Sequence, residues 1–254
     1  MKNNYLILAS AILCAGLVPV YSQPGRAPAM PQMTGHMAKL FGGITAYSAT
    51  MENQSMDSSG NTMTMPCKIF CLDGKIRIET DMAKMKSGNT NPDAADQMKA
   101  MGMNNMVMIS RPDKKISYLI YPGMQAYAEN PMQDRETTAA TANYKVETTE
   151  LGKDTVDGHP CVKTKVIVTD DQGTKHESVV WNATDLKKFP VKIESTEQGH
   201  KATMLFKDVN LAKPDAGLFD PPSDYTKYDS IQAMMRAQMM KRMGGGMGMP
   251  PMDH

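Results

Sequence analysis

Apolar and polar side chains alternate along most of the chain from Ile44 onward. In one such run Cys67, Ile69 and Cys71 fall on one face, and the Asp73-Gly74 pair that follows is a two-residue hairpin signal. Asp157-Gly158 is a further turn signal between two later strands. The pattern predicts about eleven strands, at residues 47–51, 65–71, 76–80, 106–110, 116–121, 124–128, 145–151, 161–169, 175–182, 191–196 and 202–210. Many short strands separated by turns are typical of a single antiparallel sheet or barrel.

Two segments interrupt this alternation, and the first is a short predicted helix. Asn91 is a suitable helix cap, and Pro92 occupies the first helical position, where a missing N–H costs nothing. The helix is expected to run to about residue 101. It lies in a methionine-rich insertion, residues 84–105, between two predicted strands.

The second predicted helix covers residues 229–243. Asp229 or Ser230 caps its start, and Gly244 stops it. Apolar side chains recur every four residues along it, at Ile231, Met235, Met239 and Met243. The glycine-, methionine- and proline-rich tail after it, residues 244–254, is expected to be disordered.

One predicted strand has apolar or aromatic side chains on both faces. It includes Tyr118 and Ile120 on one face and Leu119 and Tyr121 on the other. A sheet with one solvent-exposed face does not need apolar side chains on both faces of a strand. Either both faces are covered, or the inner face lines an apolar pocket. Tyr118 and Ile120 are therefore candidate ligand contacts.

The N-terminus carries the pattern of a secretory signal peptide. Lys2 precedes an uncharged apolar run at residues 5–20, and Ser22 offers a small residue at the cleavage position. Cleavage near Ser22 predicts an exported protein of the periplasm or cell envelope. Residues 23–41 contain three prolines and two glycines without periodicity and are interpreted as a flexible leader, so the folded domain is expected at residues 42–228.

Charge and composition exclude some classes of function. The chain has 28 Lys and Arg against 27 Asp and Glu, so it lacks the basic excess of a nucleic-acid-binding protein. Its histidines are scattered, and no nucleophile elbow, zinc-protease motif or phosphate-binding glycine loop is present. We therefore predict no catalytic residues, no enzymatic activity and no cofactor. No partner protein can be identified from the sequence.

Removal of the signal peptide leaves three cysteines, Cys67, Cys71 and Cys161. An odd number allows at most one intrachain disulfide in an oxidising compartment. On one strand, Cys67 and Cys71 would lie about 13 Å apart, beyond disulfide reach. Either Cys161 pairs with Cys67 or Cys71, or all three are buried thiols that pack as small apolar side chains.

A series of short segments carries a resemblance to a known family. The succession resembles a family of exported bacterial proteins classed as a domain of unknown function, which is distantly similar to the outer-membrane lipoprotein carrier and its receptor, the LolA/LolB-like fold. The resemblance covers about residues 42–228, and the segments are residues 75–79, 108–115, 118–122, 156–161, 180–182, 189–193 and 218–222.

This resemblance implies a mainly β structure, an antiparallel half-open barrel with one or two helices over its mouth. In carrier relatives the apolar cavity of such a barrel holds acyl chains. Our leading hypothesis is therefore a non-enzymatic binding protein for a lipid or another hydrophobic small molecule. Met235 and Met239 would turn inward from the 229–243 helix, which alternatively lies on an anionic membrane surface.

Methionine supports a second hypothesis, because the chain has 26 of these residues. Thioether sulfur is a soft ligand that suits Cu(I) or Ag(I). The glycine-rich tail has no core to pack into, so its side chains Met247, Met249, Met252 and His254 are candidate soft-metal ligands. A third hypothesis is an envelope interaction protein whose sheet binds no small ligand.

Overall fold

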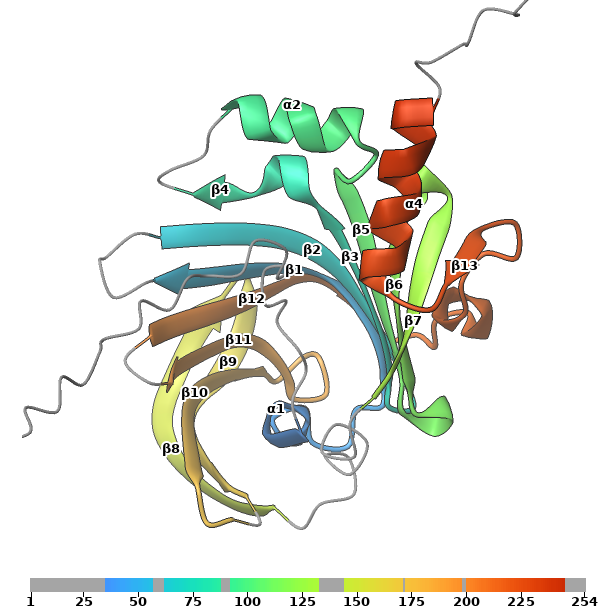
Figure 1. Cartoon of the computed structure of the whole chain (residues 1–254). Coiled ribbons are helices and arrows are strands. Elements are labelled where there is room, and N and C mark those ends of the chain that lie inside the picture. Colours follow the sequence, from blue (N-terminus) through green and yellow to red (C-terminus); the bar gives the residue numbers. More distant parts are fainter. Residues whose placement is uncertain are drawn as a thin grey trace, which may run out of the picture. The chain divides into compact units, whose positions relative to one another are not determined.

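The computed structural model describes residues 35–56, 62–87, 92–132, 144–170, 172–197 and 200–244 (Figure 1). The predicted signal peptide and the C-terminal metal candidates, Met247 to His254, lie outside these residues.

One open antiparallel sheet dominates the described residues. Its order is β13-β7-β6-β5-β3-β2-β1-β12-β11-β10-β9-β8, with β4 paired to β2, and it does not close into a barrel (Figure 1). The mainly β fold predicted from the alternation, and the half-open form implied by the family resemblance, are therefore confirmed. The strands are β1 (Ala46–Met56), β2 (Thr62–Leu72), β3 (Lys75–Asp81), β4 (Lys86–Ser87), β5 (Asn105–Arg111), β6 (Ile116–Tyr121), β7 (Ala126–Pro131), β8 (Lys145–Val156), β9 (His159–Thr169), β10 (Lys175–Ala183), β11 (Phe189–Glu197), β12 (His200–Asn210) and β13 (Thr226–Tyr228).

Both predicted helices are present within about two residues, as α2 (Pro92–Ala100) and α4 (Ile231–Gly244). A further short helix, α1 (Gly35–Lys39), lies in the segment where no regular element was expected, and Leu40 and Phe41 after it are buried. Single turns of 3₁₀-helix connect several strands: η1 (Met82–Lys84), η2 (Pro112–Lys114), η3 (Pro122–Met124) and η4 (Ala216–Phe219).

Asp-Gly pairs make the tight hairpins that the sequence predicts. Asp73 and Gly74 join β2 to β3 with φ angles of 49° and 82°, and Asp157 and Gly158 join β8 to β9 with φ angles of 50° and 82°. Positive φ at both central residues is the requirement of a type I′ turn, whose twist matches that of the flanking strands. These turns fix the register of both hairpins.

The helix α1 lies inside the curve of the sheet (Figure 1), and an aromatic cluster packs beside it. The rings of Phe41, Tyr47, Phe189 and Phe206 pack with centroids 5.0–5.6 Å apart. Phe41 belongs to the segment after α1, whereas the other three belong to three different strands. Their packing anchors the N-terminal segment inside the curve, and this half of the concave side is core rather than an open pocket.

The two ends of the sheet differ from its interior. At one end, β13 has three residues and pairs in parallel with β7. At the other, β8 has twelve residues, most of them exposed, and its pairing with β9 shifts register between Glu150 and Gly152. Gly152 has a φ of 136°, a conformation that favours glycine.

Candidate functional site

β6 is buried on both faces, and this strand with its neighbours β5 and β7 is the candidate site. Residues 118–121 of β6 are all buried. Alternation and register place Tyr118 and Ile120 on the convex face with Ile109, and Leu119 and Tyr121 on the concave face. Of the two alternatives that the sequence left open, covered faces or an apolar pocket, the structure shows this strand with both faces buried.

The convex face is covered by residues 211–225, which we call the strap. Its η4 turn contacts β3 and β5. Phe219, at the end of η4, has no exposed surface and packs in one cluster with Ile109, Tyr118 and Ile120. Burying a whole phenylalanine side chain stabilises a fold by about 1.5–3 kcal/mol. Tyr118 and Ile120 therefore belong to a filled core beneath the strap.

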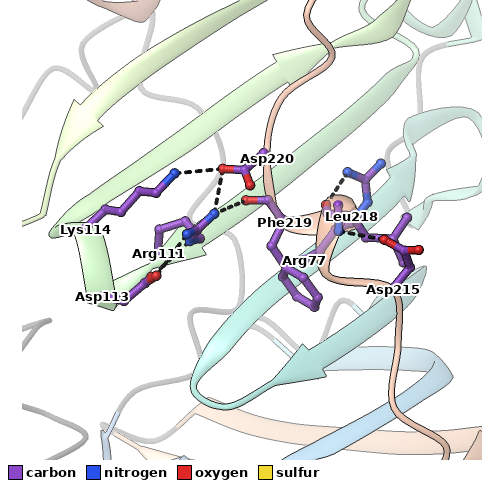
Figure 2. Close-up of polar contacts among 9 residues, drawn as sticks. Arg77, Arg111, Asp113, Lys114, Asp215, Leu218, Phe219 and Asp220 are labelled. Carbon is purple, nitrogen blue, oxygen red and sulfur yellow. Dashed lines mark hydrogen bonds and ion pairs between the residues drawn. The ribbon is translucent and has the colours of Figure 1, made fainter.

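Two arginines of the sheet bind the strap through charge-assisted hydrogen bonds (Figure 2). Arg111 Nη1 donates to the Phe219 carbonyl at 3.1 Å and to Asp220 Oδ1 at 2.6 Å. Its Nε and Nη2 donate to the two carboxylate oxygens of Asp113, both at 2.9 Å. Arg77 Nη1 donates to the Leu218 carbonyl at 2.9 Å. The strap is thus fixed at three consecutive residues.

Burial makes the Arg111 interactions strong. Only 7% of Arg111 is exposed, so its guanidinium needs these partners to replace lost hydration. The hydrogen bond to Asp113 is the main reason why the pKa of Arg111 is raised and that of Asp113 is lowered. Lys114 Nζ also donates to Asp220 Oδ1 at 2.9 Å, but both side chains are about half exposed. Arg111 is therefore the centre of this contact.

We place α4 over the opposite, concave face. Among the strands, α4 contacts β7 and β13. On its concave face β7 presents Ala126 and Ala128, both without exposed surface, and such small side chains allow a helix to approach closely. Met234 of α4 also has no exposed surface. The helix begins with a cap in which the Ala233 N–H donates to Ser230 Oγ at 3.1 Å.

The four predicted ligand contacts are not brought together. Tyr118 and Ile120 lie under the strap on the convex face, whereas Met235 and Met239 are on the helix assigned to the concave face. Met239 is 66% exposed and Met235 is half-buried, so the inward-pointing methionine is Met234, one residue away from the predicted position. Leu119 and Tyr121 take the place of Tyr118 and Ile120 on the concave face.

Two open hollows lie in the described surface. One, of about 570 Å³, is lined by the β8–β9 hairpin and Thr184. The other, of about 450 Å³, is lined mostly by polar residues of β2, β3 and β5 and by Lys84. Neither includes a residue of α4. The second hollow reaches the concave face at Cys67, Thr80 and Met106.

In the structure, Cys67, Cys71 and Cys161 are free thiols, and all three are buried. Four strands separate β2, which carries Cys67 and Cys71, from β9, which carries Cys161. Burial raises the pKa of Cys67 to about 12 and that of Cys71 to about 11. These thiols stay protonated, which makes them weak nucleophiles.

Cys161 follows His159 by two residues, and the His159 ring pairs with the carboxylate of Asp185. His159 Nδ1 and Asp185 Oδ2 are 2.8 Å apart, but Cys161 Sγ donates to the His159 backbone carbonyl at 3.3 Å. In a catalytic cysteine–histidine pair the thiol would hydrogen-bond to the imidazole ring instead.

Within the described ranges, no group of three or more histidine, cysteine, aspartate or glutamate side chains is arranged to hold a metal ion. No helix in the same ranges is long and apolar enough to cross a membrane.

A comparison with protein families decides the relationship of the chain. The family described as "Domain of unknown function (DUF4412)" matches residues 55–189, more than half of the 254-residue chain. The chain belongs to the DUF4412 family. This confirms the resemblance to a family classed as a domain of unknown function. The matched region contains Arg111 and β2 to β10, whereas the strap and α4 follow it in the sequence. No curated protein matches the chain.

Solved structures similar to this DUF4412 protein include members of the LolA-like group. A LolA superfamily protein from Nitrosomonas europaea is 6% identical, with a TM-score of 0.37, over 74% of this chain and 96% of that chain. The lipoprotein LppX from Mycobacterium tuberculosis is 9% identical, with a TM-score of 0.38, over 70% and 93%. LprF from Mycobacterium bovis is 10% identical, with a TM-score of 0.39, over 76% and 94%.

Proposed function

We propose that this DUF4412 protein is an exported, non-enzymatic binding protein for a lipid or another hydrophobic small molecule. The ligand lies on the concave face of β5–β7, in the place that α4 covers in the structure. The observation that carries the proposal is the way α4 is held. For its described side chains, residues 231–241, no hydrogen bond or ion pair joins the helix to the sheet.

Because apolar packing alone holds the described side chains of α4, an apolar ligand could replace the helix on the sheet. Met234 contributes an unbranched thioether side chain that repacks at little cost. Lifting the helix exposes apolar surface of Leu119, Tyr121 and the two alanines, at about 25 cal/mol per Å². An apolar ligand that covers the same area recovers this free energy, and no polar bond has to break.

The outer side of α4 suits contact with a lipid surface. Met239 and Met240 are about two-thirds exposed, and Arg236 and Lys241 are exposed beside them. Exposed apolar side chains next to cations are the composition of a helix that contacts anionic bilayers. We propose that a lipid ligand is taken from or delivered to such a surface. The tail residues Met247 to His254 stay an untested prediction of a metal site.

Two substitutions on α4 separate the proposed mechanism from an inert cover. Met234→Glu places a charge at a buried position and should lift the helix, whereas Met239→Glu places it in solvent. Fluorescence of an apolar dye should rise several-fold with Met234→Glu and stay unchanged with Met239→Glu. Far-UV circular dichroism of both variants controls for an intact sheet. Unchanged dye binding in a folded Met234→Glu protein would contradict the proposal.

Native mass spectrometry of the exported protein tests the ligand directly. The proposal expects a co-purified mass of lipid size that Met234→Glu alters in occupancy and Met239→Glu does not. N-terminal sequencing of the same sample tests export and cleavage near Ser22. A protein that retains residues 1–22 and carries no adduct would contradict both parts.

A further inference from the structure

Sulfur atoms gather in one patch of the concave face, away from the tail methionines. Register fixes the patch: Met51 on β1 pairs with Cys67 on β2, Cys67 pairs with Thr80 on β3, and Thr80 pairs with Met106 on β5. Met65 precedes Cys67 by two residues on β2 and therefore shares its face. We call these four sulfur-bearing residues the sulfur cluster: Met51, Met65, Cys67 and Met106.

The sulfur cluster is withdrawn from water. Its four side chains are between 3% and 5% exposed. Directly opposed side chains on antiparallel strands have Cβ atoms about 4.5–5.5 Å apart, so Met51 and Cys67 are neighbours. Met106 is one strand further away, but Thr80 between them is small and the face is concave, which directs neighbouring side chains toward one another.

An unpartnered hydroxyl lies inside this patch. Thr80 is 2% exposed, and its Oγ1 has no hydrogen-bond partner among the residues that the structure describes. Burying a hydroxyl without a partner costs about 1–3 kcal/mol, and native structures keep few such groups. Its neighbours across both adjacent strands are Cys67 and Met106. A cation bound beside Thr80 would place a polar group next to this otherwise unpartnered hydroxyl.

We propose that the sulfur cluster binds one soft monovalent cation, Cu(I) or Ag(I), through the Cys67 thiolate and thioether sulfurs of Met51, Met65 and Met106. Thiolate and thioether ligands select Cu(I) over the divalent ions that prefer nitrogen and oxygen. On binding, Cys67 Sγ releases its proton to solvent and forms the bond to the metal, and no electron is transferred. The site is independent of the hydrophobic ligand and of residues 247–254.

Packing alone would also bury these side chains, since methionine and cysteine serve as apolar filler. The two explanations differ in what Ag(I) does. A single Ag(I) ion should bind the metal-free mature protein with an affinity that depends on Cys67 and on the thioethers together. If the residues are filler only, removing thioether sulfur at constant shape should leave the affinity unchanged.

Matched variants on the same strands make the experiment specific. Cys67→Ser should abolish tight binding, whereas Cys71→Ser, on the same strand and face, should not. Met51→Leu and Met106→Leu should each weaken Ag(I) binding by about tenfold or more, whereas Met108→Leu should have no effect. Leucine replaces methionine at nearly constant volume, so these proteins should fold.

Thr80→Val removes the hydroxyl at constant shape and supplies a second readout. The metal-free variant should melt at a higher temperature because the unpartnered group is gone, while its Ag(I) affinity should fall by about tenfold. Competition titration with a chromophoric chelator measures the affinities, and X-ray absorption of the Cu(I) form should show a shell of sulfur.

Three results would overturn the proposal. One is Ag(I) binding that survives Cys67→Ser and disappears when residues 245–254 are removed. The second is an affinity that Cys67→Ser lowers while all leucine variants retain the wild-type value, because a lone thiol would then be the ligand. The third is a Cu(I) shell dominated by nitrogen or oxygen.

Discussion

The strap and α4 cover opposite faces of the β13 end of the sheet, and they do so with different chemistry. The strap is held by a fully buried phenylalanine and by the buried guanidinium of Arg111, which contacts it directly at Phe219 and Asp220. α4 is held by a buried methionine, with no described side-chain hydrogen bond to the sheet. Hydrogen bonds to charged groups and large-ring burial resist opening, whereas thioether packing yields easily. From this difference we expect the strap to stay part of the core and α4 to be the easier of the two to displace.

The largest expected effect concerns the anchor of the strap. Phe219→Ala should lower the free energy of unfolding by about 4 kcal/mol, because it leaves a cavity between strap and sheet. Urea denaturation measures the change, with half-buried Leu218→Ala as the milder control. An unchanged midpoint would mean that the strap detaches independently of the sheet, and the contrast with α4 would disappear.

Loss of the guanidinium should have the next largest effect. Arg111→Met keeps the apolar stem but removes the bonds to Asp113, Asp220 and the Phe219 carbonyl. We expect a loss of about 2 kcal/mol, since hydrogen bonds of charged groups are worth more than neutral ones. The control is Lys114→Met, whose exposed ion pair with Asp220 should contribute less than about 0.5 kcal/mol. Equal losses of unfolding free energy in the two variants would show that burial does not strengthen the hydrogen bonds of Arg111.

The matching substitution in α4 should act locally. Met234→Ala should shift global unfolding by less than about 1 kcal/mol, because the helix can open while the sheet stays folded. Amide hydrogen exchange should nevertheless accelerate strongly across residues 231–241. Met235→Ala, at a half-buried position, serves as the control. A global loss as large as that of Phe219→Ala would make α4 a structural element rather than a mobile cover.

The smallest expected effect is a dependence of the strap on pH. Arg111 lowers the pKa of Asp113 below its unfolded value of about 3.9, so this carboxylate adds stability above that pH. The contribution should be lost as the pH falls through the lowered folded-state pKa. Urea midpoints of wild type and Arg111→Met should therefore converge in acid. The convergence should be small because Asp113 is 45% exposed and solvent screens the pair. If the difference between the two urea midpoints stayed constant down to pH 2, the effect of Arg111 would come from its bond to the neutral Phe219 carbonyl and not from Asp113.

The strands could be predicted from the sequence because period-two alternation is a local signal. Asp73-Gly74 and Asp157-Gly158 marked the hairpins for the same reason, and the required positive φ angles are found there. The short elements β4 and β13 and the helix α1 were missed. They contain two to five residues, too few to establish a period, and tertiary pairing determines their structure.

The candidate site was harder to predict because it depends on distant contacts. Apolar side chains on both faces of residues 116–121 indicated either two covered faces or an apolar pocket, but not which element covers which face. Arg111 and Phe219 are 108 residues apart, and no local pattern joins them. In α4, apolar side chains surround more than half of the helix, so spacing alone favoured Met235 where the structure buries Met234.

The sulfur cluster could not be predicted without knowing the order of the strands in the sheet. Met65 and Cys67 share a visible alternation, but Met106 reaches the same patch only because β5 pairs with β3 across the insertion that contains β4 and α2. The sequence contained each sulfur atom without showing that they are neighbours.

The exposed edge at β8 has a consequence for how the protein behaves at high concentration. A long unpaired strand is a template on which other chains can add strands and grow into fibrils. In β8 the register shift beside Gly152 interrupts a straight edge, and Lys145, Glu147 and Lys153 surround it with charge. The opposite edge, β13, offers three residues, too few to support an added strand. A sheet that is not closed into a barrel can therefore stay monomeric without polymerising through its own edges.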